Sequence, residues 1–279
     1  MSGSTIRRKL PCSKCGYDLE GLSPEANCPE CGLDIYSTLA RQLDPATDSL
    51  ERSPELLRIA WWIYLASLGS VVACAIVVAP VAAAVRTAPG LPAWVRPGLD
   101  GAAAIAPYAT LLGTTIGLAA TLGILPWRLA SGGRGRPGLV RARILGGIGF
   151  LIWSVAAAQS ASFEACVLAT AGAAAVAGSA TPLLRQLVPH SRLFRTARHA
   201  TQNTRELVLS AAIAGSAGLL ALLLARDRGE AANYAVYATI VAAASAMLLV
   251  VGFGYRLVNA HWILQSVRRP PPRVDEIIR

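Results

Sequence analysis

Six long apolar runs constrain this chain more than any other feature of its sequence. They cover about residues 59–85, 101–127, 144–162, 165–184, 207–225 and 234–255, and Glu164 is the one charged residue between the third run and the fourth. A helix needs about 20 apolar residues to cross the hydrocarbon core of a bilayer, and no soluble fold needs six such segments. We therefore predict an all-α polytopic membrane protein, in which residues 54–255 form about six transmembrane helices.

The third and fourth runs leave their own topology open. Residues 144–184 are long enough for two crossings that are joined by a tight turn at residues 162–164. The alternative is a re-entrant hairpin, which enters the membrane and returns to the same side. Both arrangements leave the flanking segments on one side, so the topology of the other runs does not depend on this choice.

The charged residues are sorted by the side on which each connecting segment should lie. Although 54% of the residues are apolar and only 15% are charged, the formal net charge is +10. When the segments are assigned to alternate sides, those on the side of the N-terminus hold 22 of the 26 Lys and Arg residues and the whole positive excess. Lys and Arg in short loops favour the cytoplasmic side. The pattern predicts a multi-pass protein of the bacterial inner (cytoplasmic) membrane with both termini in the cytoplasm, and it makes the lipid bilayer a partner.

Small residues within the runs indicate close packing between helices. Gly113 and Gly117 form a GxxxG pattern in the second run. In lipid, such residues let two helix backbones approach each other closely. We interpret the pattern as helix packing within the chain rather than as a dimer seam, and the oligomeric state stays open.

Four cysteines near the N-terminus form the most chemically specific motif of the chain. Cys12 and Cys15 make one CxxC pair, Cys28 and Cys31 make a second, and twelve residues separate the two pairs. A glycine follows each pair and can adopt the positive φ that such a turn requires. Two turns of this kind that face each other form a tetrahedral four-sulfur site for zinc or a single iron. Because cytoplasmic thiols stay reduced, we predict a metal site rather than two disulfides.

The segment CSKCGYDLEGLSPEANCPECG, residues 12–32, resembles the N-terminal zinc ribbon of planctomycete-type membrane proteins, whose pattern is roughly CxxCGYDLRGL…CPECG. The resemblance is limited to these residues and does not extend to the helices. The same spacing is similar to the rubredoxin-like knuckle of rubrerythrins, in which four cysteines bind iron and pass electrons. Both resemblances imply the same ligands, Cys12, Cys15, Cys28 and Cys31, with zinc as the metal in the first case and iron in the second.

The cysteine motif is acidic in spite of the basic excess of the whole chain. Between Cys12 and Cys31 the sequence has one cation, Lys14, and four acids, Asp18, Glu20, Glu25 and Glu30. Such a face repels the phosphate groups of DNA and RNA. Nucleic acid is therefore disfavoured as a partner, and a protein partner at the cytoplasmic ribbon fits better.

The sequence also predicts where the parts of the chain begin and end. Residues 1–35 form the ribbon and residues 36–53 form a linker. The first transmembrane helix should begin near Pro54, because proline suits the first helical position and an acid suits the first turn. Residues 256–279 should continue the last helix as a cytoplasmic juxtamembrane helix and end in a short exposed tail.

The motifs of the chain favour a non-enzymatic function. No catalytic residue and no cofactor-binding motif is identified, and the six runs contain no ionisable residue except Glu164. The leading hypothesis is a ribbon that is structural or mediates protein interaction or assembly. One alternative is a membrane-tethered, rubredoxin-like iron protein that transfers electrons. Small-solute transport is a second alternative, which the lack of charged groups inside the helices disfavours.

Overall fold

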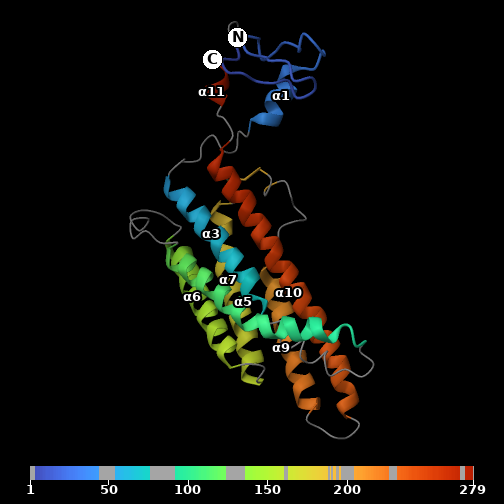
Figure 1. Cartoon of the computed structure of the whole chain (residues 1–279). Helices are drawn as coiled ribbons and strands as arrows, with labels where there is room; N and C mark the ends of the chain where they lie inside the picture. The colour runs from blue at the N-terminus through green and yellow to red at the C-terminus, as the bar shows by residue number, and fades with distance from the viewer. Residues whose placement is uncertain are drawn as a thin grey trace.

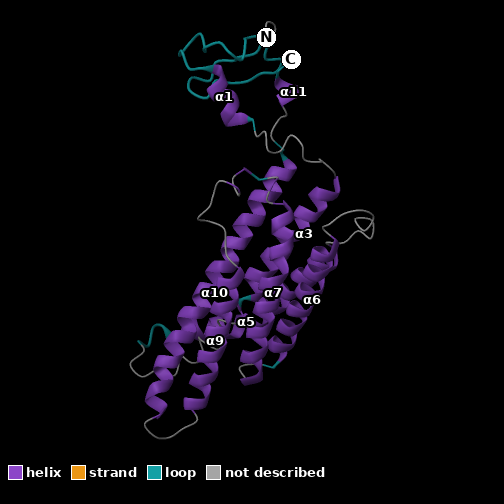
Figure 2. Ribbon diagram, turned by 180° about the vertical axis from the view of Figure 1, so that it is seen from behind, coloured by secondary structure: helices purple, strands orange, loops and turns teal. Residues whose placement is uncertain are grey.

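The computed structural model describes residues 4–43, 54–75, 92–123, 136–159, 163–187, 189, 191–192, 195, 204–225, 231–270 and 274–278 (Figure 1). Within these ranges the regular elements are helices, and β pairing is limited to isolated bridges (Figure 2). The helices are α1 (Ile35–Gln42), α3 (Pro54–Ala73), α5 (Arg96–Gly123), α6 (Arg136–Ala158), α7 (Phe163–Leu187), α9 (Thr204–Ala225), α10 (Ala231–Arg268) and α11 (Val274–Ile277). The expected all-α architecture is confirmed for this part of the chain.

Six long helices form a bundle in which each helix packs against its neighbours in the chain. Helix α3 packs against α5, α5 against α6, α6 against α7, α7 against α9, and α9 against α10. Helix α10 in turn packs against α3, so the six helices form a closed ring. The first and the last helix of the bundle, α3 and α10, are therefore adjacent in space. This arrangement brings the chain that enters the bundle next to the chain that leaves it.

Five of these helices are long and apolar enough to cross a membrane. They include the segments Pro54–Ala73, Arg96–Gly123, Val140–Ala158, Thr204–Ala221 and Tyr234–Arg268. The remaining helix, α7, contains a shorter apolar segment, Val167–Ser179. At about 1.5 Å per residue, its 25 residues still extend over roughly 37 Å. The sixth crossing, and the choice between two crossings and a hairpin, stay predictions.

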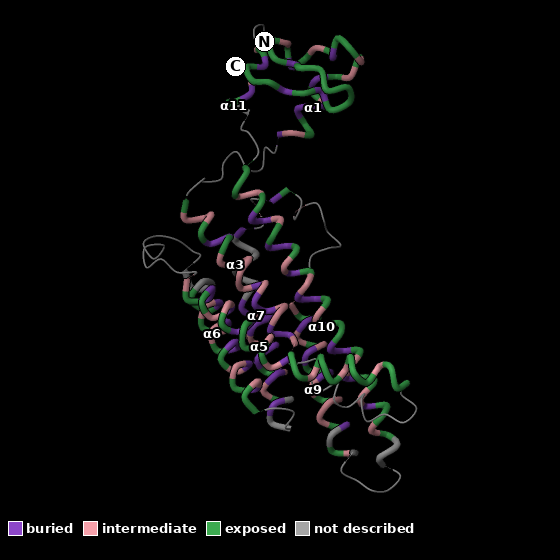
Figure 3. Tube along the Cα trace, viewed as in Figure 1, coloured by how far each residue is buried: buried purple, intermediate pink, exposed green. Residues whose placement is uncertain are grey.

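The bundle has small residues inside and large apolar residues outside. In α5, the buried positions are Ala106, Thr110, Gly113, Thr114, Gly117, Ala120 and Thr121. The exposed large side chains of the same helix are Ile105, Tyr108, Leu111, Leu112 and Leu122. Figure 3 shows the exposed positions on the outer surface of the bundle. A soluble helix would bury its leucines, so this pattern is that of a surface in contact with lipid.

Glycines set the distance between α3 and α5. A Cβ atom built on Gly69 of α3 would lie 2.7 Å from the Gly113 carbonyl oxygen and 2.7 Å from the Gly117 nitrogen. A Cβ atom on Gly113 would in turn overlap the backbone of Ala73. The GxxxG pattern thus packs against a helix of the same chain, which confirms the interpretation as internal packing.

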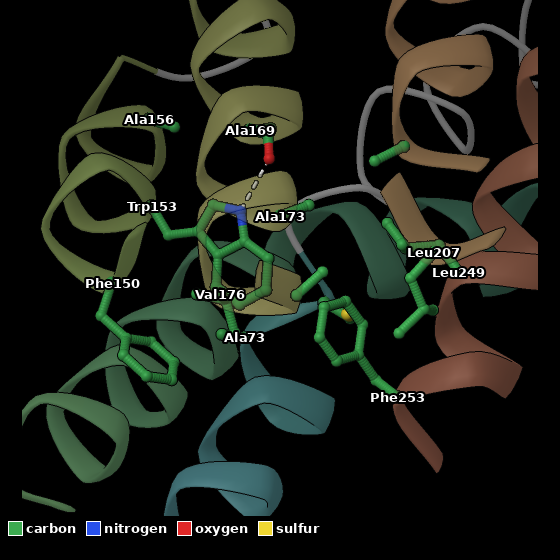
Figure 4. Close-up of a cluster of buried hydrophobic side chains, with 13 residues drawn as sticks. Ala73, Phe150, Trp153, Ala156, Ala169, Ala173, Val176, Leu207, Leu249 and Phe253 are labelled. Carbon is green, nitrogen blue, oxygen red and sulfur yellow. Dashed lines mark hydrogen bonds between the residues drawn. The ribbon is translucent and has the colours of Figure 1, made fainter. Parts of the chain in front are cut away.

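An aromatic cluster fills the centre of the bundle (Figure 4). The Trp153 ring is fully buried, and its Nε1 donates a hydrogen bond of 2.7 Å to the Ala169 carbonyl oxygen. Phe150 and Phe253 each make an edge contact with this ring at 5.9 Å between centroids. Since Trp153 belongs to α6, Ala169 to α7 and Phe253 to α10, the cluster ties three helices together.

Helix α1 corrects the predicted linker. The sequence predicts a linker at residues 36–53, but residues 35–42 are helical and belong to the ribbon. Asp34 caps the helix by accepting a hydrogen bond from the Tyr36 N–H, and Leu39 and Leu43 are buried against the ribbon. The ribbon thus extends to residue 43, because these leucines supply apolar surface that a short cysteine motif lacks.

The C-terminal segment corrects the predicted exposed tail. Helix α10 does continue past Trp262 to Arg268, as expected. Residues 274–278, however, return to the ribbon at the N-terminus (Figure 1). Ile277 is 1% exposed in the core that it shares with Ile6, Leu10 and Leu19. The two ends of the chain therefore form one small unit.

Candidate metal centre

The two CxxC turns have the same backbone hydrogen bonds. In the first turn, Cys12 N–H donates to Tyr17 O at 2.8 Å and Gly16 N–H donates to Cys12 O at 2.9 Å. The second turn repeats both bonds sixteen residues later, from Cys28 to Leu33 and from Gly32 to Cys28, at the same distances. Gly16 has φ 80° and Gly32 has φ 68°. The predicted left-handed glycines are confirmed, and they explain why glycine follows each cysteine pair.

An aspartate supports the segment after each turn, and sequence reasoning missed this role. Asp18 accepts hydrogen bonds of 3.2 Å from Leu10 N–H and from Glu20 N–H. Asp34, the residue sixteen positions later, accepts one from Tyr36 N–H at 3.1 Å. The repeated pattern CxxCGxD carries the signal, because both aspartates fall at the same place relative to their turns.

The four cysteine sulfurs come together as predicted. The Sγ atoms of Cys12 and Cys31 are 3.6 Å apart, as are those of Cys15 and Cys28. All four ligand atoms lie within 4.8 Å of one another. A disulfide would need about 2.05 Å between sulfurs. Zinc or iron with metal–sulfur bonds of about 2.3 Å in a tetrahedron places sulfurs roughly 3.8 Å apart, so the donor set fits such an ion.

The acidity of the thiols is uneven around the cluster. The backbone N–H groups of Lys14 and Cys15 lower the pKa of the Cys12 thiol to about 6. The Tyr17 N–H lowers that of Cys15, but desolvation and the neighbouring thiols outweigh it and raise the pKa of Cys15 to about 12. Four thiolates at this distance repel one another, whereas a divalent cation among them would favour full deprotonation. The cluster could therefore hold a cation.

One side of the cluster is covered and the other is open. Cys12 and Cys28 are buried, Cys31 is half-buried and Cys15 is exposed. The covered side faces the core formed by Leu10, Leu19 and Ile35. Metal binding would thus fix the two turns against this core, while the side of Cys15 stays accessible to a partner.

The ribbon contacts the bundle through the segment between α7 and α9. Arg192 Nη1 donates hydrogen bonds to Arg41 O at 2.8 Å and to Leu43 O at 3.2 Å, at the end of α1. These carbonyls have no partner within the helix, because they lie in its last turn. Ser191, the preceding residue, accepts a hydrogen bond of 3.2 Å from Ser266 of α10. One short segment therefore links the ribbon to the last long helix.

Arg256 is a buried charge that sequence reasoning missed. The sixth run was counted as ending at Tyr255, which placed Arg256 in the cytoplasmic segment. In the structure it lies within α10, and its side chain is 3% exposed. The lack of charged groups inside the helices, which was inferred from the six runs, is therefore wrong for Arg256. The side chain of Glu164 itself lies outside the described residues.

The cysteine cluster stands apart from other groups of metal-ligating residues. Within the described ranges, it is the one set of three or more His, Cys, Asp or Glu side chains that could hold an ion. His261 is exposed, and its Nε2 lies 2.7 Å from Nε2 of Gln265. His190 and His199 lie outside the described residues.

Comparison with known proteins returned no match to a protein family, to a curated protein or to a solved structure. The four-cysteine cluster and the apolar bundle are the two features of the chain that bear on its function.

Proposed function

We propose that this chain is a six-span protein of the bacterial cytoplasmic membrane whose ribbon is a zinc-dependent clasp. In this proposal, zinc held by Cys12, Cys15, Cys28 and Cys31 folds a cytoplasmic unit that joins the two ends of the bundle. The observation that carries it is the burial of Ile277 in the ribbon core. A module that only coordinated metal would not need a segment more than 200 positions away in the chain.

Two kinds of contact support the clasp. Arg7 N–H donates a hydrogen bond of 2.8 Å to Ile277 O, and Ile6 pairs with Ile278 in an antiparallel bridge. Ile6 and Ile277 are each 1% exposed, so the apolar contact between the two ends is dry. Small ribbons draw most of their folding free energy from the metal, about 10–16 kcal/mol in zinc-finger peptides. Zinc would therefore hold the C-terminal segment in place indirectly, by folding the surface on which it packs.

The outer face of the clasp supports docking of a protein partner. Tyr36 is 68% exposed, and Tyr17 is exposed beside Cys15. The ribbon also exposes five acidic residues, namely Asp18, Glu20, Glu25, Glu30 and Asp34. Aromatic residues within a charged rim are typical of interaction sites. We propose a basic protein surface as the partner, since the same charges repel nucleic acid.

Electron transfer by iron is a second candidate, because the Cys15 side of the cluster is exposed. An exposed ligand shortens the distance that an electron must travel between the metal and a redox partner. An iron tetrathiolate absorbs visible light, whereas zinc with its filled d shell does not. A colourless protein with stoichiometric zinc would exclude this candidate.

Replacing Ile277 with aspartate tests the clasp without touching a metal ligand. We expect Ile277→Asp to keep its zinc but to release the C-terminal segment, because a carboxylate at a position that is 1% exposed must return to water. Hydrogen–deuterium exchange of the Arg7 amide should accelerate by about tenfold or more.

Glu25→Ala provides the control, since it removes an exposed carboxylate of the ribbon away from Ile277. It should leave both the zinc content and the exchange unchanged. If Ile277→Asp left the protection of the Arg7 amide intact, the C-terminal segment would not depend on the ribbon core and the clasp would be refuted.

A further inference from the structure

Arg256 carries its positive charge inside the bundle without a carboxylate partner among the described residues. Its Nη1 donates a hydrogen bond of 3.2 Å to Val176 O, and its Nη2 donates to Ala177 O. The guanidinium also lies over the Phe253 ring, 5.4 Å from the centroid. These contacts bring dipoles and a π face to the charge, but no opposite charge. A buried ion is costly unless it is paired, and the part of the chain that the structure describes supplies no carboxylate to pair with Arg256.

A small cavity, lined by apolar and hydroxyl-bearing side chains, adjoins Arg256. Side chains from α3, α5, α6, α7 and α10 line it, and its hydroxyl-bearing residues are Ser67, Ser70, Thr121 and Ser179. The other lining residues include Ile63, Ala142 and Phe150. Among the described residues, the lining contains no acidic side chain. The cavity has room for about one particle of the size of a water molecule.

Arg256 and the four hydroxyl-bearing residues supply the hydrogen-bond donors of this cavity. The two bonds to Val176 and Ala177 leave Nε–H and one N–H on each Nη of Arg256 uncommitted. The Ser70 and Thr121 hydroxyls now donate to carbonyls of their own helices, at 2.7 and 2.9 Å. Those carbonyls belong to helical turns, so each hydroxyl can rotate its hydrogen toward the cavity. The positive charge of Arg256 would repel a cation in this cavity and attract an anion.

We propose that this cavity binds a small monovalent anion of the size of chloride, with Arg256 as its counter-ion. The charge of Arg256 selects the sign, the hydroxyl groups supply further donors, and the volume excludes phosphate and carboxylate ligands. Because the five lining helices belong to different parts of the ring, the bound anion stabilises the bundle. The proposal concerns the membrane domain and does not depend on the metal in the ribbon.

Thermal unfolding of the full-length protein in chloride and in gluconate tests the site. At matched ionic strength, the wild type should melt about 5 °C or more higher in saturating chloride, because a ligand that binds only the folded state stabilises it. Arg256→Gln should abolish this chloride dependence, since it keeps a hydrogen-bond donor but removes the charge. Arg268→Gln, the same change at an exposed position of α10, should respond to chloride as the wild type does.

The outcomes separate an anion site from a purely structural arginine. Equal melting temperatures of the wild type in the two salts would overturn the proposal, as would a full chloride response in Arg256→Gln. If Arg256→Gln does not fold, Thr121→Val replaces it, because this variant keeps the volume and removes one donor. It should raise the half-saturating chloride concentration by about fivefold or more, and an unchanged concentration would again overturn the proposal.

Discussion

Replacing Cys28 with serine is expected to abolish metal binding and to unfold the ribbon, while the bundle stays folded. Cys28 is 2% exposed and contributes both a ligand and part of the ribbon core. Without the metal, the remaining core is too small to order residues 4–43 on its own. The affinity for zinc should fall by at least about 100-fold, as measured by competition with a chromogenic chelator.

The same variant should release the C-terminal segment, since the surface that holds Ile277 is lost. Amides of the ribbon and of residues 274–278 should then exchange at the rate of an unfolded chain. Cys74→Ser is the matched control, because Cys74 is a buried cysteine of the bundle outside the cluster. A Cys28→Ser protein with a protected ribbon would show that the fold does not need the metal.

The second large effect is expected where α3 crosses α5. Gly113→Leu should lower the free energy of unfolding by about 3 kcal/mol or more, because the new side chain would have to occupy the space of the Gly69 and Ala73 backbones. Backbone atoms on both sides cannot rotate away as a flexible side chain can, so the helices must separate. Denaturation in mixed micelles measures the loss.

Gly147→Leu is the control for this change. A Cβ atom on Gly147 of α6 would meet nothing within 4 Å, so leucine there should be tolerated. It should even gain some helix propensity over glycine, about 0.5–1 kcal/mol. Equal destabilisation by the two variants would mean that close backbone contact between α3 and α5 does not stabilise the bundle.

The local features of this chain were predictable from sequence because they depend on neighbouring residues. The four cysteines, Gly16 and Gly32 define two tight turns, and the structure brings the four sulfurs together. The apolar runs likewise predict the long helices, since membrane crossing depends on length and composition. In each case the residues that form the pattern are close to one another in the sequence.

The features that sequence reasoning missed depend on contacts between distant segments. Nothing near Ile277 indicates that it packs against Ile6, because an isoleucine in a short polar tail has no periodic pattern. Arg256 was misplaced for a different reason. A charged residue at the end of an apolar run is typical of the end of a membrane-spanning segment. Helix α10, however, extends to Arg268, and the side chain of Arg256 is buried within the bundle.

Elemental analysis of the native full-length protein tests the central claim most directly. We expect about one zinc per chain, no visible absorbance, and loss of zinc in Cys28→Ser but not in Cys74→Ser. Stoichiometric iron with a visible absorption band would contradict the zinc clasp in favour of electron transfer. A metal-free protein with a folded ribbon would contradict both.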